Sequence, residues 1–226
     1  MLALTPQLVE LEALRSGFRK CGHEAVHSDT GRMEIWRISS LELTLAVAGH
    51  GKAQFALQSQ YLLGELQDVE GIVCTGGAGG LDPRLQVGDI VVGTTTVEHD
   101  YRIRFVQVPL AEHPGNGKFL ATLKSVVESS SNCRGVWFDR IASGDEDIVD
   151  PVRSAQLREE TGAVCVAWEG SGGARAAAFN GLPFVEIRGI TDGANETARG
   201  DYHQNLQIVM PRIAELIVRW RQHDLR

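Results

Sequence analysis

Short runs of apolar and β-branched residues alternate along the chain with longer stretches in which apolar residues recur every three or four positions. The short runs have the pattern of strands covered on both faces, and they are residues 43–49, 71–77, 89–97, 163–168 and 183–190. The longer stretches predict helices at residues 5–19, 52–66, 152–161, 170–180 and 202–222. Strands that alternate with helices predict a largely parallel sheet covered on both sides, with a functional site at the strand ends.

The length of 226 residues is sufficient for one α/β domain with a substantial core. We find no internal repeat and no low-complexity tract. Residues 112–118 and 127–135 are the only notable loop-like stretches, and neither has the composition of a domain linker. The sequence therefore predicts a single domain over residues 1–226.

Charge and composition remove several classes of function. The net charge of −7, with Lys and Arg scattered among acids, offers no basic face for nucleic acid. No window is apolar enough to span a membrane, and the N-terminal segment breaks at Pro6 instead of forming a signal-peptide core, so we expect a cytoplasmic protein. The four cysteines lack metal-ligand spacing and are predicted to be reduced thiols, with no metal bound.

Two of the predicted strands end in glycine-rich turns, GHGKAQ at 49–54 and CTGGAGGL at 74–81. Glycine lets backbone amides approach a ligand closely, but neither turn has the spacing of a dinucleotide fingerprint or a P-loop. Tight packing between strand and helix explains either turn alone. Two such turns at the ends of adjacent predicted strands favour a shared binding site that includes Gly77, Ala78 and Gly79.

These turns, SGD at 143–145, WEGSGGARAAAF at 168–179 and PFVEIRGITDGAN at 183–195 follow the order and spacing of the nucleoside phosphorylase superfamily. Over nearly its whole length the chain most resembles the branch that hydrolyses 5′-methylthioadenosine and S-adenosylhomocysteine. The resemblance implies a three-layer α/β/α sandwich around a mixed, partly barrel-like sheet, with no cofactor. It also implies a homodimer in which a loop of one subunit closes the 5′ pocket of the other, and Phe105 resembles the apolar contributor of that loop.

Cleavage of an N-glycosidic bond requires an acid at the base and a negative environment at the sugar. Asp192 matches the family aspartate that protonates the purine near N7, and an apolar setting would help it to keep a proton; capping of a following helix is the alternative. Glu169 matches the glutamate that accepts hydrogen bonds from the ribose hydroxyls, with a helix-start acid as the alternative. Arg188 resembles a family arginine, or forms a buried ion pair.

Several positions depart from the family pattern and indicate an altered pocket. Trp168 replaces the usual methionine beside the sugar. Asp147 replaces an aromatic residue that stacks on the purine, which forfeits about 1 to 3 kcal/mol, while Ile148 keeps the place of the residue whose backbone holds the base edge. His50 stands where an apolar residue is usual, and Gly77 where serine is frequent.

The water-activating glutamate of the hydrolases follows the first strand, and alignment puts Gln7 at its position. Glutamine can orient a water but cannot accept its proton. Glu10 and Glu12 lie nearby on the same predicted helix, where an exposed face is the simple interpretation of both. Glu12 could act as the base only in a different register.

The leading prediction is hydrolysis of a purine nucleoside to free base and sugar, with Asp192 as the acid. A phosphate-dependent phosphorylase is the second reading, but phosphate needs cationic donors and the turn at 74–81 lacks the arginine that phosphorylases typically have there. A nucleoside-binding protein with weak or no turnover is the third, and Gln7 is the feature that favours it.

Overall fold

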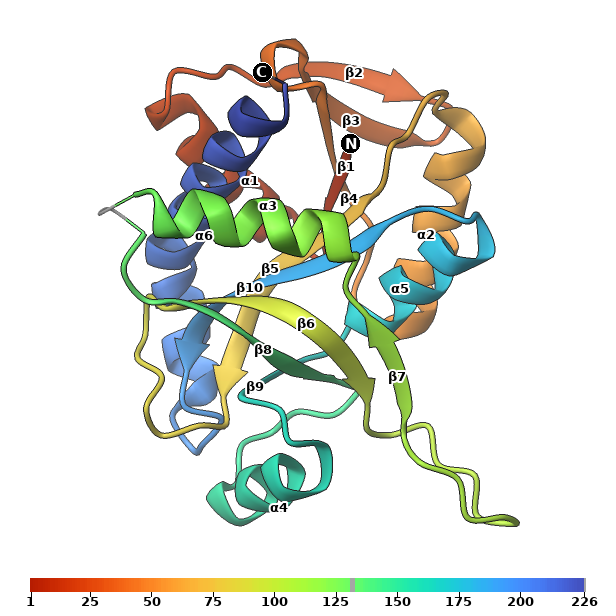
Figure 1. The fold of residues 1–226 in the computed structure, drawn as a ribbon, viewed down its shortest axis with the longest axis vertical. Coiled ribbons are helices and arrows are strands. Elements are labelled where there is room, and N and C mark those ends of the chain that lie inside the picture. Colours follow the sequence, from red (N-terminus) through yellow and green to blue (C-terminus); the bar gives the residue numbers. More distant parts are fainter. Residues whose placement is uncertain (131–132, 226) are drawn as a thin grey trace.

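The computed structural model describes residues 1–130 and 133–225, and it consists of a single mixed sheet with helices packed on both sides (Figure 1). The strands are β1 (Leu2–Thr5), β2 (Val26–Thr30), β3 (Met33–Ile38), β4 (Leu43–Val47), β5 (Ile72–Gly80), β6 (Ile90–Glu98), β7 (Ala111–Pro114), β8 (Val136–Ser143), β9 (Cys165–Ala167) and β10 (Phe184–Asp192). The helices are α1 (Leu8–Lys20), α2 (Lys52–Glu65), α3 (Gly117–Glu128), α4 (Pro151–Thr161), α5 (Gly170–Phe179) and α6 (Ala198–Asp224), with a short 3₁₀ turn, Ser39–Leu41.

The sheet closes on itself over half of its strands. The strand order is β10-β6-β8-β9-β5-β1-β4-β3-β2, and β10 also pairs with β5, so that β5, β10, β6, β8 and β9 form a ring. Pairing within the ring is mixed, because β5–β10, β6–β8 and β8–β9 are parallel whereas β6–β10 and β5–β9 are antiparallel. The predicted mixed, partly barrel-like sheet is confirmed, and the expectation of a largely parallel one was too simple.

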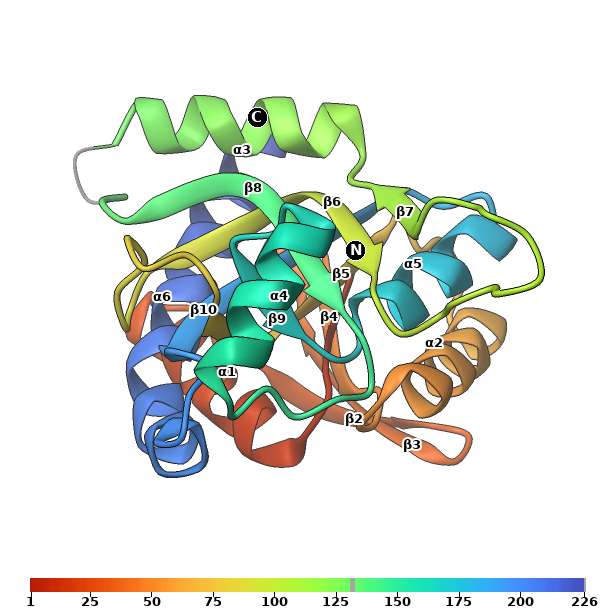
Figure 2. The same ribbon diagram turned by 90° about the horizontal axis from the view of Figure 1, so that it is seen from below.

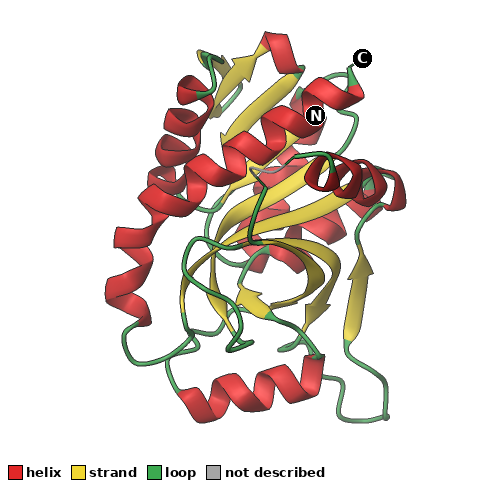
Figure 3. Ribbon diagram, turned by 60° about the vertical axis from the view of Figure 1, so that its left-hand side comes forward, coloured by secondary structure: helices red, strands yellow, loops and turns green. Residues whose placement is uncertain are grey.

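The helices divide between the two faces of the sheet, as the predicted three layers require. Helices α1, α3 and α6 cover one face around Phe18 and Trp220, whereas α2 and α5 cover the other around Phe55 and Phe184 (Figures 1 and 3). Helix α4 lies across one end of the barrel (Figure 2). Helices α1 and α6 approach so closely that a Cβ at Gly17 would lie 2.6 Å from the Pro211 Cα. No helix in the described part of the chain is both long and apolar enough to cross a membrane.

Several predicted boundaries shift in the structure. Strand β5 runs on through Gly80, so most of the glycine-rich segment at 74–81 is buried strand and not turn. Strand β1 lies between β4 and β5, so the two glycine-rich segments do not follow adjacent strands. The predicted loop at 112–118 contains most of β7 and the start of α3. The predicted loop at 127–135 includes residues 131–132, which lie outside the described residues.

Candidate active site

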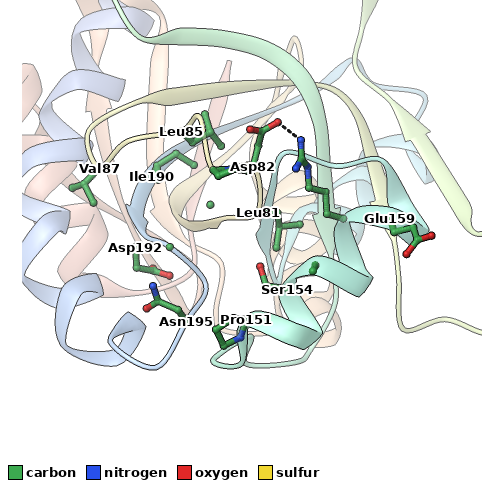
Figure 4. A pocket seen from close by; sticks show the side chains of 15 residues that line it. Leu81, Asp82, Leu85, Val87, Pro151, Ser154, Glu159, Ile190, Asp192 and Asn195 are labelled. Atoms are coloured by element: carbon green, nitrogen blue, oxygen red, sulfur yellow. Dashed lines mark hydrogen bonds and ion pairs between the residues drawn. The ribbon is translucent and has the colours of Figure 1, made fainter.

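Two hollows adjoin the barrel, and Asp192 contacts both. The larger, about 840 Å³, is a groove between α4 and the end of β10, where Asp192 and Asn195 lie across from Ser154 and Glu159 (Figure 4). Asp192 is the only predicted site residue among its lining. The smaller, about 470 Å³, is lined by every predicted site residue except Glu12 and Phe105. The smaller hollow is therefore the candidate active site.

Asp192 ends β10 beside Gly79 of β5 and is 7% exposed. Its Oδ1 accepts a hydrogen bond from the Ala194 amide at 2.9 Å, and the Thr191 hydroxyl lies 2.8 Å from its Oδ2. Burial raises the pKa of Asp192 above the usual value of 3.8, although both hydrogen bonds oppose the shift. Helix α6 begins at Ala198 with Thr197 as its N-cap, so the alternative that Asp192 caps this helix is wrong.

Glu10 is a site residue that was not predicted from the sequence. It lies on the first turn of α1 and is 1% exposed, so the interpretation of Glu10 as part of an exposed face is wrong. Its Oε1 accepts a hydrogen bond from the Gly77 amide at 2.9 Å, and its Oε2 accepts one from the Gln7 amide at 3.1 Å. Burial and the negative charge of Glu169 raise the pKa of Glu10 to about 7.

The two residues considered as the base occupy different places. Gln7 is the N-cap residue of α1 and lines the pocket, with its Nε2 3.4 Å from the His50 Nδ1. Glu12 is exposed and does not line the pocket, so its prediction as a site residue is wrong. A helix turns about 100° per residue, which puts Glu12 about 200° from Glu10 and keeps Glu10 on the side of Leu14 and Gly17. This periodicity was the signal that could have identified Glu10.

Glu169, Arg188 and Glu186 form a buried ion network behind the pocket. The Arg188 Nη2 lies 3.2 Å from the Glu169 Oε2, and the Arg188 Nε lies 2.8 Å from the Glu186 Oε1. Burial raises the pKa of Glu186, against the effect of Arg188. The ion-pair interpretation of Arg188 therefore holds, and the same side chain also lines the pocket. Glu186 was not predicted, because it lies in a run that has the pattern of an ordinary buried strand.

The turn at 49–54 orients the carboxylate of Glu169. Gly51 has a φ of 82°, a conformation that favours glycine, and its amide donates a hydrogen bond to the Glu169 Oε1 at 3.2 Å. His50 in the same turn packs against Trp168, with ring centroids 4.3 Å apart and the rings tilted by 40°. The His50 Nδ1 also lies 3.6 Å from the Glu169 Oε1. The turn thus contributes to the pocket through its backbone and through the His50 side chain.

Tyr202 of α6 is a second residue that the sequence analysis did not place in the site. It lines the pocket, and burial together with the charge of Glu10 raises its pKa above the usual 10. A Cβ at Gly77 would lie 2.8 Å from the Tyr202 Cε2, so any side chain at this position would displace the ring. Gly77 therefore makes room for Tyr202 beside Glu10.

The wall on the side of residues 146–149 is polar at its edge. Ile148 is buried and lines the pocket, whereas Asp147 lines it from an exposed position. Glu146 also lines it, held by Arg153 through two hydrogen bonds of 2.7 Å. Phe105, on the connection between β6 and β7, is fully exposed and lies outside the pocket of its own chain.

Comparison with known proteins assigns the chain to a family. Residues 5–220 match the phosphorylase superfamily. The chain belongs to this superfamily. It is 28% identical, over 80% of each chain, to a 5′-methylthioadenosine/S-adenosylhomocysteine nucleosidase of Geobacillus thermodenitrificans. It is 30% identical to an aminodeoxyfutalosine nucleosidase of Campylobacter jejuni, over 72% of this chain and 73% of that one.

A solved member of the superfamily has the same fold. The Neisseria meningitidis 5′-methylthioadenosine/S-adenosylhomocysteine nucleosidase, in complex with methylthio-immucillin-A, superposes with a TM-score of 0.83. The two chains share 25% identity, and the match covers 99% of this chain and 98% of the other. The nucleoside phosphorylase-like fold expected from the sequence is therefore confirmed.

One group of side chains among the described residues has metal-ligand spacing. It consists of His27, Asp29 and Glu34 on the β2–β3 hairpin, all exposed and all outside the pocket of this superfamily member. Exposed groups of this kind are common without a bound ion. The pocket itself offers carboxylates that hydrogen-bond to backbone amides or pair with Arg188.

Proposed function

We propose that this protein hydrolyses the N-glycosidic bond of purine nucleosides and releases the free base and the free sugar. The main observation in support is that one pocket holds two buried carboxyl groups with raised pKa values, Asp192 and Glu10, which lie at different positions along β5. Glu10 meets β5 at Gly77 and Asp192 meets it at Gly79, two residues or about 7 Å apart. This separation suits an acid at the base and a second group at the sugar.

Asp192 is the proposed general acid. The departing purine gains electron density, and a carboxyl group that keeps its proton through desolvation can donate it to a ring nitrogen. The raised pKa of Asp192 and its low exposure support this role. Ala78 and Gly79 lie on β5 beside the end of β10, and Ile148 lines the same pocket.

Glu10 is the proposed general base, in the place that the sequence analysis gave to Gln7. A carboxylate with a pKa of about 7 is suited to accept a proton from water near neutral pH. The two backbone amides that donate to Glu10 hold it in one orientation. Glutamine at position 7 is therefore no longer an argument for a protein that only binds nucleosides, because Glu10, three residues further on, can act as the general base.

Glu169 is the proposed partner of the ribose hydroxyls. Its position between Gly51 and Arg188 fixes a carboxylate in the pocket, where negative charge favours the positive charge that develops on the sugar. Phosphate as the nucleophile is less favoured. Arg188, the buried cation of the pocket, is already paired with two carboxylates, and a phosphate ion would have to compete with both.

The test is an incubation with 5′-methylthioadenosine, S-adenosylhomocysteine, adenosine and inosine, with and without phosphate, read by chromatography. We expect free base and free reducing sugar at equal rates in both buffers. Product that forms only with phosphate, as ribose 1-phosphate, identifies a phosphorylase instead. If all four nucleosides remain intact at high enzyme concentration while calorimetry detects binding, the proposal of hydrolysis is refuted.

A homodimer is part of this proposal. The β6–β7 connection exposes a run of apolar side chains that a second copy of the chain can cover: Tyr101, Ile103, Phe105, Val106 and Val108. Phe105→Asp should shift sedimentation towards the monomer, and a wild-type protein that sediments as a monomer contradicts the proposal. The cytoplasmic location stays a prediction from the sequence.

A further inference from the structure

Gln7 and His50 form a polar wall of the pocket next to the carboxylates that we propose at the sugar. Their side chains contact each other at 3.4 Å. Gln7 adjoins Glu10 through its backbone amide, and His50 adjoins Glu169 at 3.6 Å. Both residues therefore lie next to Glu10 and Glu169, after β1 and β4, whereas Asp192 ends β10 on the other side of β5.

This position assigns the wall to one part of the substrate. If the base lies at Asp192 and the ribose at Glu169 and Glu10, the substituent that remains to be placed is the one on the 5′ carbon. The neighbours of Gln7 and His50 fix them on the ribose side of the pocket. A nucleoside bound in this way places its 5′ substituent against Gln7 and His50.

The chemistry of the wall then selects the substituent. Contact with the Trp168 ring limits the movement of the His50 ring, and 49% of the His50 side chain is exposed. An alkylthio group placed against an amide and an imidazole would remove water from both without replacing its hydrogen bonds. A hydroxyl group both donates and accepts, so it can satisfy either partner.

We propose that the pocket is specific for purine nucleosides with a hydrogen-bonding oxygen on the 5′ carbon, in the simplest case the free 5′-hydroxyl, over their 5′-alkylthio counterparts. The inference rests on the proposed nucleosidase function. It adds a substrate class and assigns Gln7 and His50 as its determinants. If a second copy of the chain adds residues to the mouth of the pocket, this polar wall still forms one side of the 5′ site.

The test compares kcat/KM for adenosine, 5′-deoxyadenosine and 5′-methylthioadenosine with the native protein. These substrates carry a hydroxyl, a hydrogen and a methylthio group on the same carbon. We expect adenosine to be preferred over each of the others by about tenfold or more, the size of effect typical of one unpaired polar contact. A preference for 5′-methylthioadenosine, or equal rates for adenosine and 5′-deoxyadenosine, overturns the inference but leaves the nucleosidase proposal intact. Failure of all three substrates overturns the nucleosidase proposal itself.

Two variants test the assignment to these side chains. His50→Leu and the double variant with Gln7→Leu should reduce the ratio of adenosine to 5′-methylthioadenosine about tenfold, through loss with adenosine and gain with the thioether. His27→Leu is a matched control, because the His27 side chain is 48% exposed and contacts the Trp36 ring edge-on, outside the pocket. Its ratio should equal that of the wild type. A ratio unchanged in the His50 variants, with circular dichroism that shows them folded, overturns the assignment.

Discussion

Replacement of Glu10 by glutamine should slow catalysis strongly. It should also reduce the loss of folding stability that the wild type shows as the pH rises. The change keeps the size of the side chain and removes its charge. Glutamine can hold a water but cannot take its proton, so kcat should fall about 10² to 10⁴-fold. The same proton-binding property that suits Glu10 to its proposed role makes its ionised form costly to bury.

The cost follows from the shift in pKa from 4.5 to about 7. The folded state binds this proton more tightly than the unfolded chain does. The contribution of Glu10 to stability is therefore present in full below pH 4.5 and is lost as the pH rises through 7. The loss amounts to roughly 3 kcal/mol in all, and to roughly 2 to 3 kcal/mol between pH 5 and pH 8.

Glutamine does not titrate in this range, so the variant escapes the loss. It does have one acceptor oxygen where Glu10 uses two, for the amides of Gly77 and Gln7. The lost hydrogen bond costs about 1 to 3 kcal/mol. This cost applies at both pH values, so it cancels when the effect of the substitution at pH 8 is compared with its effect at pH 5.

The assay is urea unfolding of wild type and Glu10→Gln at pH 5 and pH 8. The free energy of unfolding of the variant, relative to the wild type, should rise by roughly 2 to 3 kcal/mol between the two. Glu12→Gln, an exposed change on the same helix, should show no such difference. Parallel pH dependence of wild type and Glu10→Gln would refute the raised pKa, and full activity of the variant would refute its role as the base.

Three further substitutions test the rest of the site. Asp192→Asn should lower kcat by about 10² to 10⁴-fold with little change in substrate affinity, and near-normal turnover would exclude Asp192 as the acid. Thr191→Val removes a hydrogen bond that lowers the pKa of Asp192, so one limb of the pH–rate profile should move to higher pH. An unmoved profile contradicts the assignment of that limb. Glu186→Gln frees Arg188 to act more strongly on Glu10, whose pKa should fall. The acidic limb should then move to lower pH, and a move to higher pH contradicts this coupling.

The sequence predicted five of the ten described strands and five of the six described α-helices, because the apolar residues of these elements recur with the expected periods. It predicted poorly where burial does not follow from such a pattern. Strand β2 is mostly exposed and polar, so it gives no signal of a strand. Strand β5 ends in small residues, which have the composition of a turn although the strand continues to Gly80. The ring closes through the β5–β10 pairing between distant segments, which periodicity cannot reveal.

A site residue could be predicted from the sequence where its own position in the chain marks it, and not where its role depends on distant partners. Asp192 and Glu169 lie at element ends, where the motif and the strand end coincide. Glu10 was missed because the alignment gave its place to Gln7, although helical periodicity already puts it on the buried face. Glu186 could be recognised only from its ion pair with Arg188 in the structure. In the sequence it is a single acidic residue in an apolar strand, and nothing there identifies its partner.

Asp192 and Glu10 are proposed for opposite roles although burial raises both pKa values, so the difference has to come from their surroundings and from the substrate. Glu10 faces Glu169, whereas Asp192 receives hydrogen bonds from Thr191 and Ala194. A purine that enters beside Asp192 excludes water, which keeps the carboxyl group protonated, and the electron density that the purine gains as the bond breaks draws this proton to a ring nitrogen. The ribose develops positive charge beside Glu10, which favours the ionised form of Glu10 that can accept a proton from water. The bound substrate thus favours opposite protonation states of the two carboxyl groups before the bond breaks, and proton transfer from Asp192 to the purine and from water to Glu10 then exchanges these states.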